Sequence, residues 1–221
     1  MKLDKNTFDK WVQWLEKIES DLYCVVNNQQ IYKYFINVVN ANIDHIKANE
    51  GSLFCDFVRQ CYGVQAASAI RRQIKEGDDS ISLMRLLKQI KQCASQFTYD
   101  FYLKCYPVIN EHEVQKSKFQ EFSDDGKTIS EDKIDDDIEE LEKIGKVADF
   151  VDRKIAHLDK RGLKELVTYN DLEESINILN KMICKYIRLI TNAVPEYSSL
   201  EATIQWDWEK IFSVPFDIRK I

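Results

Sequence analysis

The fold class follows from one stretch of the sequence, TISEDKIDDDIEELEKIGKVADFVDRKIAH (residues 128–157). Its apolar side chains recur every three or four residues, which is the period of one face of an α-helix. Thr128 and Glu131 have the spacing of a capping box, so a helix is expected to begin here, and Gly162 is expected to end it. The apolar stripe consists of Ile134, Ile138, Leu141, Ile144, Val147, Val151 and Ile155.

The same helical period continues on both sides of this stretch. Trp11, Trp14 and Leu15 begin a stripe with i, i+3, i+4 spacing near the N-terminus. Thr168 and Asp171 repeat the capping-box spacing ahead of another strong stripe. The main predicted helices cover residues 7–44, 52–75, 80–93, 130–158 and 170–193. Ser80 is the expected N-cap of the third of these helices. The aromatic stretch 97–107 is compatible with a short helix or a covering loop.

Composition agrees with an all-α protein. The chain has 221 residues, 44% of them hydrophobic, which is enough for a real core. Only 6 Gly and 3 Pro argue against a turn-rich β-sandwich and against Pro/Gly-rich disorder. We therefore expect an all-α helical bundle over residues 1–195 and a C-terminal helical extension over 196–221, with a short helix after Ser198.

Charge is concentrated in one segment. The net charge is −6, which does not indicate a globally basic nucleic-acid binder, although a local basic site remains open. Residues 111–140 carry twelve acidic and four basic side chains, so the rest of the chain is nearly neutral. The acidic connecting segment, near 111–137, is interpreted first as a solvated linker leading into an exposed helix start. The alternative is an acidic arm that inhibits the protein or binds a partner.

Several function classes lack their motifs. The six cysteines form no CxxC pair, and none stands at zinc-ligand spacing from a histidine, so no metal site is expected. There is no Gly-rich phosphate loop, HExxH or nucleophile elbow, and no cofactor is expected. The sequence shows neither a signal peptide nor an apolar run of membrane-spanning length, so we expect a cytoplasmic protein without a membrane partner.

His157 is the most interesting titratable residue. Arg153 stands four residues earlier, so on an α-helix both would project from one face, with Asp152 and Lys160 close by. An imidazole beside a cation can transfer protons while the cation holds a phosphate. The alternative is a polar network in the bundle core. The other two histidines, His45 and His112, are interpreted as surface residues.

Arg71 and Arg72 form the second candidate group. Adjacent residues point about 100° apart on a helix, so one arginine can face inward while the other faces outward. An inward guanidinium needs a partner. Asp78, Asp79 or another carboxylate could be a structural partner, and an RNA phosphate is the functional alternative.

The order of these elements resembles the abortive-infection HEPN family of the AbiU type. The matching pieces are the helix with Trp11 and Trp14, AIRRQIKEGDDSISLMRLL (69–87) and VDRKIAHLDK (151–160). The resemblance implies an all-α HEPN-like fold, a role in phage-related defence, and relatives that are metal-independent ribonucleases. These are commonly homodimers whose two motifs meet across the interface. His157 matches the motif's histidine, whereas Arg153 stands one residue closer to it than the motif's arginine does.

The leading hypothesis is therefore a HEPN-like defence or toxin effector that cleaves RNA without metal. His157 and Arg153 would be its catalytic residues, and Arg71, Arg72, Asp152 and Lys160 would bind the substrate. The rival is a non-catalytic HEPN-like module that dimerises or binds a partner such as an antitoxin protein. A third hypothesis is a helical scaffold with no role on nucleic acid.

Overall fold

The computed structural model describes residues 1–48, 51–105, 112–156, 165–191 and 200. Over these residues the chain is all-α, as predicted: they contain no strand, and the one β-type pairing among them is an isolated bridge between Thr98 and Thr128. None of the helices in this described part is both long enough and apolar enough to cross a membrane.

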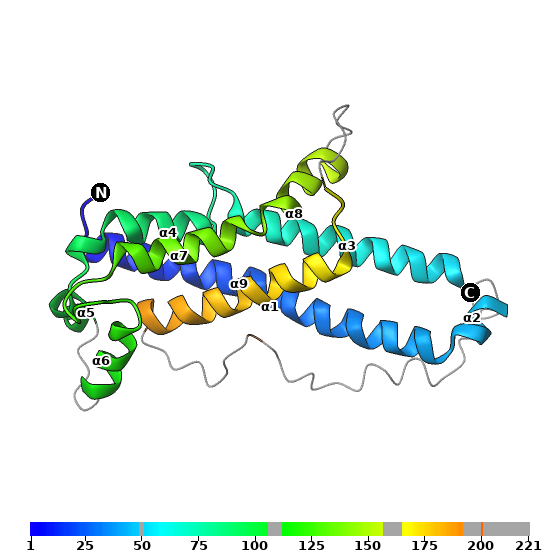
Figure 1. The fold of residues 1–221 in the computed structure, drawn as a ribbon, viewed down its shortest axis with the longest axis horizontal. Coiled ribbons are helices and arrows are strands. Elements are labelled where there is room, and N and C mark those ends of the chain that lie inside the picture. Colours follow the sequence, from blue (N-terminus) through cyan, green and yellow to red (C-terminus); the bar gives the residue numbers. More distant parts are fainter. Residues whose placement is uncertain (49–50, 106–111, 157–164, 192–199, 201–221) are drawn as a thin grey trace.

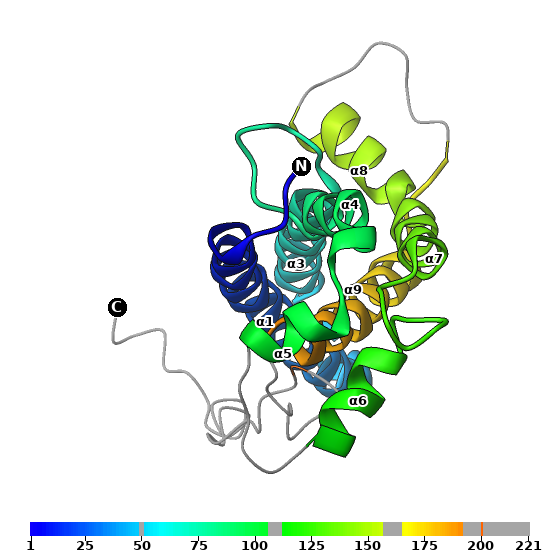
Figure 2. The same ribbon diagram turned by 90° about the vertical axis from the view of Figure 1, so that its left-hand side faces the viewer.

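Five helices form the bundle, which Figure 2 shows end-on. They are α1 (Lys5–Ala41), α3 (Ser52–Ile74), α4 (Leu83–Gln92), α7 (Glu131–Glu142) and α9 (Tyr169–Ile190). The shorter elements are α2 (Ile43–Ala48), η1 (Ala94–Gln96), α5 (Tyr99–Cys105), α6 (His112–Gln120), α8 (Gly145–Phe150) and η2 (Val151–Ile155), a π-helical turn that we call the π-turn. In Figure 1, α1 and α3 project beyond the other helices and α2 lies at the tip of this hairpin.

The N-terminal stripe lies in the core. Trp11 is fully buried, and its indole N–H donates a hydrogen bond to Gln89 Oε1 at 3.1 Å, which satisfies its one polar atom. Phe8 and Phe97 meet edge-on nearby, with ring centroids 5.7 Å apart. In the stretch left open in the sequence, residues 99–105 form α5, which follows η1, while residues 106 and 107 lie outside the described residues.

Two predicted N-caps, Thr128 and Ser80, lie two residues before the observed ones. The N-cap of α7 is Ser130, whose side chain accepts from Lys133 N–H, because the Thr128 N–H is already bound by Asp125 at 3.0 Å. The N-cap of α4 is Ser82. Ser80 instead donates its hydroxyl to the Gly77 carbonyl at 2.6 Å, inside the preceding turn.

The predicted single helix over residues 130–158 is also wrong. It ends at Glu142, restarts as α8 and widens into the π-turn, in which Ala156 N–H bonds to the Val151 carbonyl at 2.8 Å. The apolar stripe survives this break, since Ile144 and Val147 remain buried. Periodicity therefore identified the buried positions correctly, although the axis changes direction so that α8 packs on α3.

The acidic segment is not a solvated linker over its described residues. Phe119, Phe122 and Ile129 are buried in the main core. Further on, Asp137 accepts from the Tyr186 hydroxyl at 2.8 Å and from the Lys185 ammonium group at 2.6 Å. Burial first, and then the Asp137 carboxylate, raise the pKa of Tyr186. Asp137 therefore joins α7 to α9.

The capping box of Thr168 and Asp171 is confirmed at the start of α9. The Asp171 carboxylate accepts from Lys146 of α8 at 2.6 Å and from the Thr168 N–H at 2.7 Å. These hydrogen bonds lower the pKa of Asp171 from 3.8 to about 2. One carboxylate thus caps α9 and ties it to α8.

This pair predicts a pH-dependent contribution to stability. Because folding lowers the pKa of Asp171, its stabilisation is present above pH ~3.8 and is lost as the pH falls through about 2. Asp171→Asn keeps the shape without the charge, so it should lower the free energy of unfolding by about 1 kcal/mol at neutral pH, since solvent screens this accessible pair. Urea unfolding should show this difference shrinking as the pH falls from 4 towards 2. A difference independent of pH would contradict the assignment.

Candidate functional site

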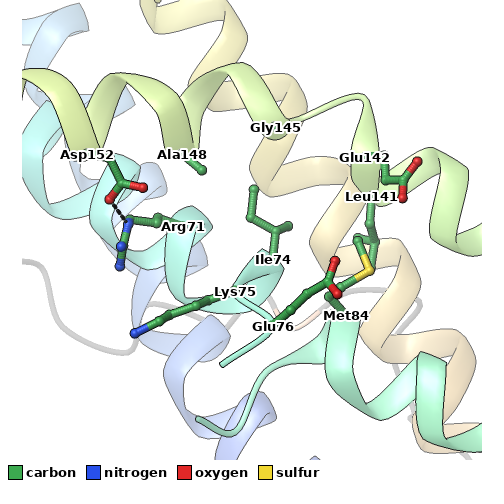
Figure 3. Close-up of a pocket in the computed structure, with 10 residues that line it drawn as sticks. All are labelled: Arg71, Ile74, Lys75, Glu76, Met84, Leu141, Glu142, Gly145, Ala148 and Asp152. Carbon is green, nitrogen blue, oxygen red and sulfur yellow. Dashed lines mark hydrogen bonds and ion pairs between the residues drawn. The ribbon is translucent and has the colours of Figure 1, made fainter. Parts of the chain in front are cut away.

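An open groove of about 310 Å³ lies between the C-terminal end of α3 and the α7–α8 junction (Figure 3). Its apolar floor includes Met84 and Leu141, and charged side chains line its rim. The lining residues are Arg71, Ile74, Lys75, Glu76, Met84, Leu141, Glu142, Gly145, Ala148 and Asp152.

Arg71 and Asp152 meet at one end of this groove. The Arg71 Nε donates to Asp152 Oδ1, so a side chain of α3 bonds to one of the π-turn, 81 residues later in the chain. Both remain accessible, with 30% of the Arg71 side chain and 49% of the Asp152 side chain exposed. Two of the three segments on which the family resemblance rests, 69–87 and 151–160, are therefore adjacent in space.

Arg72 points away from the groove. Its Nη2 donates to Asp21 of α1 at 2.7 Å, and Gln73 Nε2 donates to the same carboxylate at 2.7 Å. The two arginines diverge, and each pairs with a carboxylate other than Asp78 or Asp79, which is the alternative that the sequence left open. Arg72 and Arg71 thus do not share a site.

Arg153 is paired one turn back along its own helix. Its Nε donates to Asp149 Oδ1 at 2.6 Å, and only 15% of its side chain is exposed. The π-turn also replaces the α-helical spacing from which we placed Arg153 and His157 on one face. His157 and Lys160 lie outside the described residues, so their roles stay predictions.

Lys75 is a groove residue that the sequence analysis missed. It is the C-cap residue of α3, four residues after Arg71, and that sequence spacing is the signal that could have found it. Among the residues that the structure describes, Lys75 makes no ion pair. Glu76 beside it is bound by Lys88 at 2.6 Å. Lys75 therefore offers the groove a cation that no carboxylate neutralises directly.

The loop after α3 holds these side chains in place. Arg85 Nη1 donates to the carbonyls of Gly77 at 3.2 Å and Ser80 at 2.6 Å, closing the loop against α4. Ser82 donates its hydroxyl to the Lys75 carbonyl, which fixes the end of α3. The segment DDSISL therefore serves to shape the rim of the groove.

The chemistry on offer is anion binding by Arg71 and Lys75 beside three carboxylates. An anionic ligand would compete with Asp152 for the Arg71 guanidinium, because the Asp152 carboxylate already accepts a charge-assisted hydrogen bond from it. Within the described ranges, no group of three or more His, Cys, Asp or Glu is placed to hold a metal ion.

Comparison with known proteins gives one match. The family model HEPN_AbiU2, described as AbiU2, matches residues 8–211, which is most of the chain. No curated protein and no solved structure matches it.

Proposed function

Because the chain belongs to the AbiU2 family of HEPN proteins, we propose that it is a phage-defence or toxin effector that cleaves RNA without a metal ion. The RNA backbone would lie along the groove between α3 and the π-turn. The observation that carries the proposal is the contact between Arg71 and Asp152, which joins segments 69–87 and 151–160 at an accessible surface.

The groove would position a phosphodiester through its cations. Arg71 offers a planar guanidinium suited to two phosphate oxygens, and Lys75 adds a compact charge one turn away. RNA would displace Asp152 from Arg71, so binding would exchange one anionic partner for another. Cations at such a site accelerate the reaction most when they lie beside the oxygens on which negative charge develops in the transition state.

The proposed reaction is internal transesterification. The ribose 2′-oxygen forms a bond to the adjacent phosphorus, and the bond from phosphorus to the 5′-oxygen breaks. His157 takes the proton from the 2′-hydroxyl and returns it to the departing 5′-oxygen, so protons balance. Arg71 and Arg153 would stabilise the additional negative charge on the phosphoryl oxygens. The products are a 2′,3′-cyclic phosphate end and a 5′-hydroxyl end.

Arg71→Ala is expected to weaken RNA binding and cleavage by about 10-fold to 100-fold, the usual cost of one charge-assisted contact. The matched control is Arg72→Ala, which removes the same group from the neighbouring position where it binds Asp21. Arg72→Ala should leave RNA affinity within about 2-fold of the wild type. Filter binding and gel-based cleavage at fixed salt measure both. Equal losses in the two variants would contradict a site at Arg71.

A second candidate, a non-catalytic partner-binding module, is favoured by the pairing of the three arginines. Arg71, Arg72 and Arg153 each already bond to a carboxylate within the chain. If these pairs are structural, Arg71→Ala should lower the melting temperature and change no RNA-dependent signal. Thermal unfolding measured alongside RNA binding separates the two candidates.

A further inference from the structure

The groove beside Arg71 carries opposite charges at its two ends. Arg71 and Lys75 lie at the end where α3 meets the π-turn, and Glu142 lies at the other end, where α7 stops (Figure 3). The cationic end is the one at which an RNA phosphate would bind. The acidic end has no part in the proposed reaction, and a phosphate would be repelled there. It is therefore free to bind a different part of the same ligand.

Glu142 is the carboxylate that the acidic end offers to a ligand. Glu76, the other acidic residue there, is already bound by Lys88 at 2.6 Å. The Glu142 side chain is exposed, and in the part of the chain that the structure describes its carboxylate makes neither an ion pair nor a hydrogen bond. An ionised carboxylate has two accepting oxygens and no donor. It is therefore complementary to a ligand with two neighbouring N–H groups.

An apolar floor lies between the two ends. Ile74 and Ala148 are half-buried, and they line the groove together with Met84 and Leu141. Gly145 contributes no side chain, and a Cβ placed on it would meet no heavy atom within 4 Å. The groove thus leaves room for a flat ring above aliphatic side chains. The thioether of Met84 favours such a ring, since sulfur makes attractive contacts with aromatic systems.

The length of the groove suits one nucleotide. Seven residues separate Gly145, near the acidic end, from Asp152, the partner of Arg71, which corresponds to about 10 Å along a helix. This is comparable to the reach of a nucleotide from its phosphate to the far edge of its base. The volume of about 310 Å³ is also at the small end of the range for ligand sites. A phosphate held by Arg71 would therefore place its own base beside Glu142.

We propose that the groove binds guanine, with the Glu142 carboxylate accepting hydrogen bonds from the guanine N1–H and 2-amino groups. This inference rests on the proposed function, because it takes the phosphate at Arg71 as its starting point. Guanine is the RNA base with two adjacent donors on its Watson–Crick edge. Adenine and cytosine each present one amino donor beside an accepting nitrogen, and uracil presents one N–H between two carbonyls. Single-stranded RNA leaves this edge open to a protein.

Glu142 is thus a specificity residue, which selects the base beside the phosphate at Arg71. The test is isothermal titration calorimetry of the full chain with guanosine, inosine and adenosine 3′,5′-bisphosphates. These probes carry a phosphate on each side of the sugar, so they presuppose no direction of the RNA chain. Inosine has the charge of guanosine and lacks the 2-amino group. The wild type should bind the guanosine compound at least about 10-fold more tightly than the other two.

Glu142→Gln keeps the shape of the side chain and replaces one accepting oxygen with a donor. It should bring the three affinities to within about 2-fold of one another. Glu139→Gln is the matched control, because it makes the same change on α7 outside the groove lining, and it should keep the guanine preference. A wild type that binds the three compounds equally, or binds none of them, overturns the proposal. A guanine preference that persists in Glu142→Gln also overturns it.

Arg71→Ala tests where the phosphate lies. It should weaken all three bisphosphates by a similar factor and leave the guanine preference intact, because the phosphate and the base contact different residues. Unchanged affinities in this variant would contradict the placement of the nucleotide.

Binding and cleavage can fail separately. A chain that prefers guanine but cleaves no RNA would keep the base site and contradict the proposed reaction. A chain that cleaves RNA without a guanine preference would contradict the base site alone.

Discussion

His157→Ala is expected to abolish RNA cleavage while leaving helicity and melting temperature unchanged. Loss of the group that transfers protons costs about 10²-fold to 10⁴-fold in rate, and a single polar substitution rarely decides stability. The wild type should cleave in excess EDTA, because the proposed reaction uses no metal ion. The measurement is cleavage of labelled RNA, with end analysis for a 2′,3′-cyclic phosphate.

Arg153→Ala is the companion variant for this test. It tests whether the cation that stabilises the phosphoryl oxygens is Arg153 of the π-turn or Arg71 of α3. In the structure Arg153 is bonded to Asp149, and only 15% of its side chain is exposed. If only the His157 variant loses activity, the cation comes from α3. If no RNA is cleaved and His157→Ala lowers the melting temperature by several degrees, the catalytic proposal is wrong.

Trp11→Ala should cause the largest loss of stability, about 3–5 kcal/mol in the free energy of unfolding. The indole is fully buried against Phe8 and Phe97, so the substitution leaves a large cavity. It also leaves Gln89 without the N–H that it accepts at 3.1 Å. Urea unfolding followed by circular dichroism measures the change.

Trp11→Phe is the matched control for this cavity. It keeps most of the apolar volume and removes the hydrogen bond, so it should cost about 1–2 kcal/mol. A loss as large as that of the alanine variant would mean that the hydrogen bond, rather than the cavity, carries the stability of this region.

The fold was largely predictable because it depends on local periodicity. The stripes that begin at Trp11 and at Leu172 are buried as predicted, and the Thr168–Asp171 capping box forms. The break at residue 143 was not predictable from the stripe. Ile144 keeps its place in the apolar pattern although the helix axis turns there. The spacing of apolar residues indicates which side chains are buried, but it does not indicate the direction of the helix axis.

Long-range contacts limited what the sequence could say about the site. Asp21, the partner of Arg72, lies 51 residues away on α1, and nothing local to the arginine marks it. The nearby Asp78 and Asp79 were plausible only because they are close in sequence. Arg71 and Asp152 could be nominated by the family resemblance, whereas Lys75 carried only a spacing signal and was missed.

The π-turn has a consequence for aligning this chain with its relatives. A wide turn holds one more residue than an α-helical turn, so Ala156, which follows it, is rotated by about 100° from where an unbroken helix would place it. A motif defined by counting residues through 151–155 therefore compares side chains that point in different directions. An alignment should place a one-residue gap inside this turn before Arg153 is matched to, or excluded from, an arginine–histidine signature.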